Sequence, residues 1–110
     1  MSEIEQIEIS IDEARKEVTK MESLLRLISN KDFTALVDDG YFVEEASRLV
    51  MLRADADMQD ATSQLSINNR ITAVGYFRQY LQSIMQVGRM SEQGIREDEE
   101  TRQELLAEGL

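Results

Sequence analysis

The sequence predicts an all-α protein: an antiparallel hairpin of two long helices with a short helical cap between them. The 110-residue chain has no proline and five glycines, which excludes turn-rich β architectures. Apolar residues recur at helical spacing near both ends of the chain, as a heptad seam in one stretch and as two stripes in the other. At this length we expect a single helical domain, with arms at residues 3–29 and about 60–107 and a cap at residues 31–57.

The first predicted arm carries an unbroken heptad of apolar residues. Its members are Ile4, Ile7, Ile11, Ala14, Val18, Met21, Leu25 and Ile28. A strict seam of this kind is typical of a helix that lies along one partner helix. We therefore expect Leu25 to be buried against the second arm. Candidate capping residues, which end this helix and start the next element, are Ser29, Asn30 and Asp32.

The cap is predicted to contain two short helices, at residues 31–37 and 41–53. Between them Asp38-Asp39-Gly40 has the composition of a turn. The segment from Asp55 to Asp57 predicts a break, with Asp57 as the N-cap of the next helix. The residues expected to make the cap's contacts are Phe33, Tyr41 and Phe42.

The second arm is predicted to begin within residues 58–66, and Gly88 and Gly94 should each weaken it by about 1 kcal/mol relative to alanine. Its first apolar stripe is Ile67, Ile71, Val74, Leu81 and Met85, with Arg78 interrupting. Its second stripe is Ala73, Phe77, Tyr80, Ile84 and Val87. A helix that is apolar over this width contacts two partners. We expect the first arm to cover the first stripe. The second stripe then contacts the cap or another subunit, and the cap cannot reach all of it. The predicted interface residues are therefore Phe77, Tyr80, Ile84 and Val87.

The net charge of −10 is distributed in alternating blocks. Residues 1–13, 32–60 and 91–110 are acidic, whereas residues 14–31 and 61–90 are basic. In the predicted hairpin this gives acidic poles and a basic waist, so that neighbouring copies are expected to dock pole to waist. The interface then also includes the basic residues Arg70, Arg78 and Arg89. Nucleic acid is not expected as a partner, because binding to it usually needs a strong positive field.

Residue types that carry common catalytic chemistry are scarce. The sequence has no cysteine and no histidine, so it has no thiolate ligand and lacks the commonest proton shuttle. Asp55, Asp57 and Asp60 come nearest to a metal motif, but the glycine and glutamate of a calcium loop are missing. We interpret these aspartates as caps at a helix break. The sequence thus predicts a non-enzyme with no metal, cofactor or small-molecule substrate.

Localisation is expected to be cytoplasmic, or within a virion. No apolar run approaches the roughly 18 residues of a membrane span, and the acidic start is unlike a signal peptide. Residues 30–50 resemble stretches of small, acidic, helical proteins of tailed bacteriophages, with the sequence NKDFTALVDDGYFVEEASRLV. This resemblance implies a protein–protein role as a virion-assembly or accessory protein.

Three functions are compatible with these patterns. The first is a non-enzymatic helical interaction protein, an oligomeric structural or assembly component with itself or another protein as partner. The second is an acidic decoy, whose carboxylates mimic nucleic-acid phosphates and inhibit a host protein; Arg96 and Arg102 interrupt its C-terminal acidic run. The third is a small scaffold or chaperone, which needs exposed apolar surface at the tip of the hairpin, where Phe33, Tyr41 and Phe42 are expected.

Overall fold

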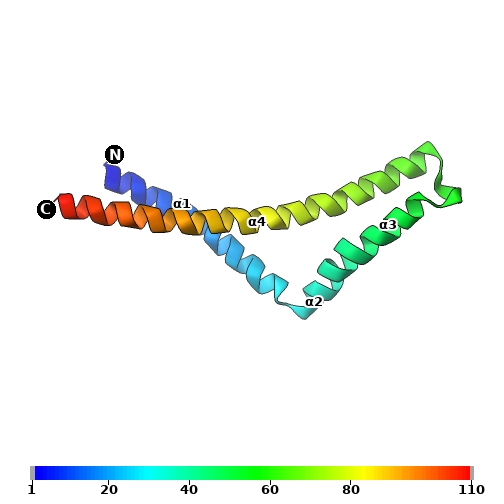
Figure 1. Cartoon of the computed structure of the whole chain (residues 1–110), viewed down its shortest axis with the longest axis horizontal. Coiled ribbons are helices and arrows are strands. Elements are labelled where there is room, and N and C mark those ends of the chain that lie inside the picture. The colour runs from blue at the N-terminus through cyan, green and yellow to red at the C-terminus, as the bar shows by residue number, and fades with distance from the viewer. Residues whose placement is uncertain (1, 110) are drawn as a thin grey trace. The chain divides into compact units, whose positions relative to one another are not determined.

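The computed structural model describes residues 2–109, and every regular element in that range is helical (Figure 1). The elements are α1 (Glu3–Ile28), α2 (Lys31–Phe33), the π-helix η1 (Thr34–Glu45), α3 (Ala46–Arg53), the 3-10 helix η2 (Ala56–Met58) and α4 (Ala61–Glu108). The two long helices are α1 and α4, and the short elements lie between them in the chain. This confirms the predicted all-α class, with a pair of long helices separated by a short helical segment.

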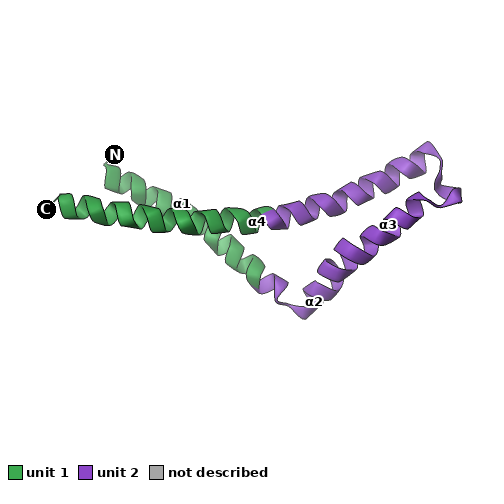
Figure 2. Ribbon diagram, viewed as in Figure 1, with its two compact units in different colours: residues 1–25, 83–110 green, residues 26–82 purple. Residues whose placement is uncertain are grey.

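The chain divides into two compact units, drawn in different colours in Figure 2. Unit 1 comprises the described residues of 1–25 and 83–110, and unit 2 comprises residues 26–82. Both α1 and α4 contribute to each unit, so no linker separates the units in the sequence. The single domain expected from chain length remains a prediction.

In unit 1, α1 and α4 run antiparallel. Met21 lies against Gly88, and towards the start of α1 the Arg15 guanidinium lies 3.7 Å from a Glu99 carboxylate oxygen. Residue numbers thus fall along α1 as they rise along α4. A Cβ atom placed on Gly88 would lie 2.4 Å from the Met21 Cβ, so the two backbones approach as closely as a glycine allows. Gly88 therefore marks the helix contact, and α4 continues through it as a helix.

The heptad seam of α1 is inside unit 1 as far as Met21. Ile11 and Met21 are 1% and 4% exposed. The half-buried seam residues are Ile4, Ile7, Ala14 and Val18. After Met21 the predicted seam is wrong, because Leu24 is 5% exposed whereas Leu25 is 40% exposed. The close approach at Met21 and Gly88 places the contact on the Met21 side of α1, and Leu24, three residues further along the helix, continues that side.

The face of α4 within unit 1 is mixed in chemistry. Its buried and half-buried residues are Ile84, Met85, Gly88, Ser91, Glu92, Gly94, Ile95, Asp98, Glu99, Arg102 and Leu105. The apolar seam of α1 therefore meets a strip in which apolar, small and charged residues alternate. The ion pair of Arg15 with Glu99 matches a charged residue of this strip with an opposite charge on α1. The sequence pattern missed this strip, because its polar members hide the helical spacing.

In unit 2, residues 31–53 form one uninterrupted helical stretch, and the predicted turn at Gly40 is wrong. Asn30 starts it, since its side-chain oxygen accepts hydrogen bonds from the backbone N–H groups of Asp32 (2.8 Å) and Phe33 (3.2 Å). Gly40 lies inside η1 with a negative φ. A Cβ atom there would lie 2.8 Å from the Ala35 carbonyl oxygen. The glycine thus leaves room for the wider π-helical turn instead of reversing the chain.

The break before α4 is present as predicted, but its caps differ. The Asp55 side chain accepts from the Asp57 N–H at 2.8 Å, and Asp60 accepts from the Ser63 N–H at 2.9 Å. The prediction of Asp57 as the N-cap is therefore wrong. The side-chain amide of Gln64 donates to the carbonyl oxygens of Arg53 (2.9 Å) and Met58 (2.8 Å), which ties the end of α3 to the start of α4.

The core of unit 2 lies between the stretch 34–53 and the first half of α4. Leu49, Ile67 and Val74 are 1%, 3% and 7% exposed. The first stripe of α4 is thus buried as expected at these positions, but its partner here is not α1. Unit 2 holds only residues 26–28 of α1, and aromatic and charged contacts join α4 to η1 instead.

Candidate protein-interaction surfaces

The second stripe of α4 is largely on the surface. In unit 2, Phe77 and Tyr80 are 38% and 54% exposed, and in unit 1 Val87 is 41% exposed while Ile84 is half-buried. Tyr76, next to the stripe, is 68% exposed. On the same helix, Ile67 and Val74 are almost completely buried. In unit 2, α4 therefore has one buried face and one apolar face that is exposed on the surface.

Phe77 has partners in its own chain. Its ring centroid lies 6.1 Å from that of Tyr41 and 5.5 Å from that of Phe42, and the last two are 5.8 Å apart. These are ordinary distances for tilted and edge-to-face aromatic pairs. The two η1 residues are half-buried, as is Phe33 at the end of α2. This aromatic cluster connects η1 to α4, so Tyr41 and Phe42 pack within unit 2.

The three arginines predicted for the interface differ in their surroundings. Arg70 lies 3.5 Å from a carboxylate oxygen of Glu45, which also binds Arg48 at 2.6 Å. The hydrogen bond from Arg48 is the main reason that the pKa of Glu45 lies below its usual value, and Arg70 adds to the effect. Among residues 2–109 no ion pair is formed by Arg78 or Arg89. Arg70 thus belongs to the η1–α4 contact, while the other two guanidinium groups remain available.

An open groove of about 330 Å³ runs along the surface of η1 and α3. We call it the α3 groove, and it is lined by Phe42, Val43, Ala46, Ser47, Val50 and Met51. Val43, Val50 and Met51 are 58%, 53% and 73% exposed. Sequence reasoning missed this surface, although the spacing of Val43, Ala46 and Val50 by three and four residues is a signal that was available.

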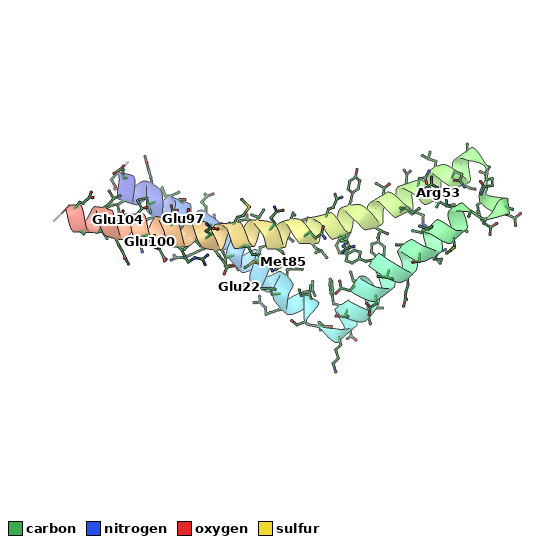
Figure 3. All side chains as sticks on the ribbon, in the orientation of Figure 1. Glu22, Arg53, Met85, Glu97, Glu100 and Glu104 are labelled. Carbon is green, nitrogen blue, oxygen red and sulfur yellow. The ribbon has the colours of Figure 1, made fainter. Side chains whose placement is uncertain are left out.

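A second groove, of about 270 Å³, lies in unit 1 between the start of α1 and the end of α4. It is lined by Glu3, Gln6, Ile7, Ser10, Asp98, Thr101 and Leu105. Nearby, Glu97, Glu100 and Glu104 are exposed on α4 and are labelled in Figure 3. Their spacing of three and four residues places them on one side of the helix.

The described part of the chain contains neither a cluster of metal-binding residues nor a membrane-spanning helix. No group of three or more acidic, cysteine or histidine residues is arranged to hold a metal ion between residues 2 and 109. Over the same residues, no helix is both long and apolar enough to cross a bilayer.

Comparison with models of protein families, with curated proteins and with solved structures finds no match to this chain. Function must therefore be argued from the molecule's own surfaces.

Proposed function

We propose that this chain is a non-enzymatic helical protein–protein interaction module, acting as an oligomeric structural or assembly component. The observation that carries the proposal is the uncovered apolar face of α4 in unit 2. Tyr76 and Tyr80 are 68% and 54% exposed, four residues apart, on a helix whose opposite residues are buried. Tyrosines in such positions contribute strongly to protein interfaces, because they bury a large apolar area and still hydrogen-bond through the hydroxyl group.

One further feature supports a contact between proteins. The guanidinium group of Arg78, between the two tyrosines in sequence, is not engaged in an ion pair in the described chain. Arginine beside tyrosine is a common composition of interface centres. The resemblance of residues 30–50 to phage accessory proteins favours assembly of a particle as the setting.

The test is the solution mass of the wild-type chain and of the double variant Tyr76→Ala with Tyr80→Ala, measured by light scattering during gel filtration. We expect the wild-type mass to exceed 12.6 kDa and the double variant to shift towards that value. Far-ultraviolet circular dichroism should show unchanged helicity, since both side chains are exposed. Leu106→Ala is the control, because Leu106 is 50% exposed but lies elsewhere on α4, and it should leave the mass unchanged. A monomeric wild-type chain at all concentrations would refute self-assembly.

The acidic decoy remains the second candidate, and one observation favours it. Unit 1 carries a net charge of −8 of the chain's −10, counted over residues 1–25 and 83–110. Glu97, Glu100 and Glu104 form an exposed acidic row on α4, and the exposed Arg96 lies beside it, four residues before Glu100. A decoy would be monomeric and would compete with duplex DNA for a DNA-binding protein. Replacement of the three glutamates by glutamine would abolish that competition.

A further inference from the structure

The α3 groove is an exposed, mainly apolar surface on the helical stretch between α1 and α4. Phe42 forms one edge of it and is held in place by Phe77. The other lining residues are the exposed Val43, Val50 and Met51 and the smaller Ala46 and Ser47. The surface is therefore a fixed feature of unit 2, with bulky side chains at its ends and small ones at its centre.

We propose that the α3 groove binds the α3 groove of a second copy of this chain, with the two helices antiparallel about a two-fold axis near Ala46 and Ser47. This inference rests on the proposed function, since it requires self-association, and it adds the surface and the direction of pairing. In a two-fold interface the same patch contacts itself, so the patch must be complementary to its own reversed copy.

The charges along this helix have that reversed complementarity. Residues 38–45 contain four acidic side chains and no basic one, whereas residues 46–54 contain two arginines and no acid. Glu45 and Arg48 neutralise each other within the chain. Asp38, Asp39 and Glu44 then remain on one half, of which Asp39 and Glu44 are exposed. On the other half Arg53, which ends α3 and is labelled in Figure 3, forms no ion pair within residues 2–109.

Antiparallel pairing places the acidic half of each copy beside the basic half of the other. Parallel pairing would place Asp39 and Glu44 beside their own counterparts, and like charges in close contact are unfavourable. The charge order thus selects one direction. The change of sign falls between Glu45 and Ala46, which puts the two-fold axis near the middle of the groove.

The shape of the groove fits the same arrangement. Packed helices lie about 8–10 Å apart, and small side chains at the contact allow the shorter distance. Ala46 and Ser47 supply small side chains at the axis, and Val43 and Val50 lie on either side of them at equal sequence distance. Reversing the helix about its centre therefore brings Val43 of one copy to Val50 of the other.

A cysteine at the axis tests the contact directly. The wild-type chain has no cysteine, so Ser47→Cys gives a protein with one thiol per chain. Two copies paired as proposed bring these thiols within the Cα separation of about 4.4–6.8 Å that a disulfide requires. We expect mild oxidation to convert most of the protein to a covalent dimer. Ser66→Cys is the control, because Ser66 is exposed on α4 and outside the groove, and it should stay monomeric on a denaturing gel.

Charge reversal tests the direction. Asp39→Lys and Arg53→Glu should each weaken the dimer, and the double variant should restore it. Exposed ion pairs are modest, but a two-fold interface contains each pair twice, so each single reversal should raise the dissociation constant roughly 3- to 30-fold. Both side chains are exposed, and the Arg53 carbonyl that accepts from Gln64 is unaffected by the change of side chain. Sedimentation of the four proteins at the same concentration gives the constants.

The outcomes separate this inference from the proposed function. Efficient cross-linking of Ser47→Cys together with rescue in the double variant supports antiparallel pairing through the groove. Self-association of the wild type without cross-linking at residue 47 overturns the inference and leaves the proposed function intact. In parallel pairing each reversed residue would still face its own counterpart, so single reversals that leave the dissociation constant unchanged, with no rescue in the double variant, overturn the direction. A monomeric wild type overturns both proposals.

Discussion

Replacement of Gly88 by alanine should destabilise unit 1, although alanine is the better helix former. The two effects have opposite sign. Removing a glycine from a helix interior stabilises by about 1 kcal/mol. The added methyl group would lie 2.4 Å from the Met21 Cβ, whereas ordinary contacts lie at 3.4–4 Å. A different Met21 rotamer moves the Sδ and Cγ atoms but not the Cβ atom, so α1 and α4 must separate by about 1 Å.

The size of the effect follows from comparing these terms. Overpacking of a close contact costs about 1–3 kcal/mol, and at Gly88 it involves the Cβ atom of a residue that is only 4% exposed. The net loss of stability should therefore be about 0–2 kcal/mol. Gly94→Ala on the same helix is a matched control, because no atom lies within 4 Å of a Cβ built there. That variant should gain up to about 1 kcal/mol. The difference between the two alanine variants isolates the packing term, at about 1–3 kcal/mol.

Urea unfolding followed by circular dichroism, with all proteins at one concentration, measures the difference. The concentration must be fixed because self-association would contribute to apparent stability. If Gly88→Ala were as stable as Gly94→Ala, the close contact of Met21 with Gly88 would not exist in solution. The antiparallel arrangement within unit 1 would then have to be reconsidered.

Two other predictions concern particular side chains. Leu24→Ala should lower the free energy of unfolding by about 2–5 kcal/mol, since Leu24 is 5% exposed. Leu25→Ala should lower it much less, because Leu25 is 40% exposed. Equal losses in urea unfolding would instead support the strict heptad seam. The pKa values of Glu45 and Asp60 lie below their usual values, owing mainly to hydrogen bonds from Arg48 and Ser63. Both carboxylates therefore stabilise the fold at pH values above their unfolded-state pKa of about 4. This stabilisation is lost as the pH falls through the lower folded-state pKa values. The urea concentration at the unfolding midpoint should thus decrease as the pH is lowered below about 4.5. This decrease should be less steep in Glu45→Gln than in the control Glu44→Gln. Parallel curves of midpoint against pH would show that the Glu45–Arg48 pair does not contribute.

Sequence periodicity predicted the long helices well because helix formation depends on local spacing. The apolar residues of α1 recur every three and four positions, and the bounds Glu3–Ile28 and Ala61–Glu108 lie close to the predicted ones. Periodicity does not specify whether Leu24 or Leu25, three and four residues after Met21, is buried. That choice depends on a close approach at Gly88, a residue 67 positions away in the chain, and a lone glycine gives no sign of its partner.

The middle of the chain shows the limit of composition rules. Asp38, Asp39 and Gly40 have the composition of a turn, yet Gly40 lies inside η1 with a negative φ. Turn residues permit a reversal but do not force one, and here the helix continues because the aromatic cluster of Tyr41, Phe42 and Phe77 connects η1 to α4. A contact distant in sequence thus overrides a local preference.

The contact between Phe77 and Phe42 links a predicted interface residue to the α3 groove, which the sequence pattern missed. Its place in the second stripe of α4 predicts Phe77 as an interface residue, but within the chain it packs on Phe42. By holding Phe42, it orients η1 so that Val43, Ala46 and Val50 line the α3 groove on the surface. The two apolar faces of unit 2, the tyrosines of α4 and the α3 groove, lie on different helices that share this cluster. Copies bound at the tyrosines and at the α3 groove would therefore both depend on this cluster, so substitution of Phe77 should weaken both contacts and lower the solution mass more than substitution of Tyr80, which weakens only one.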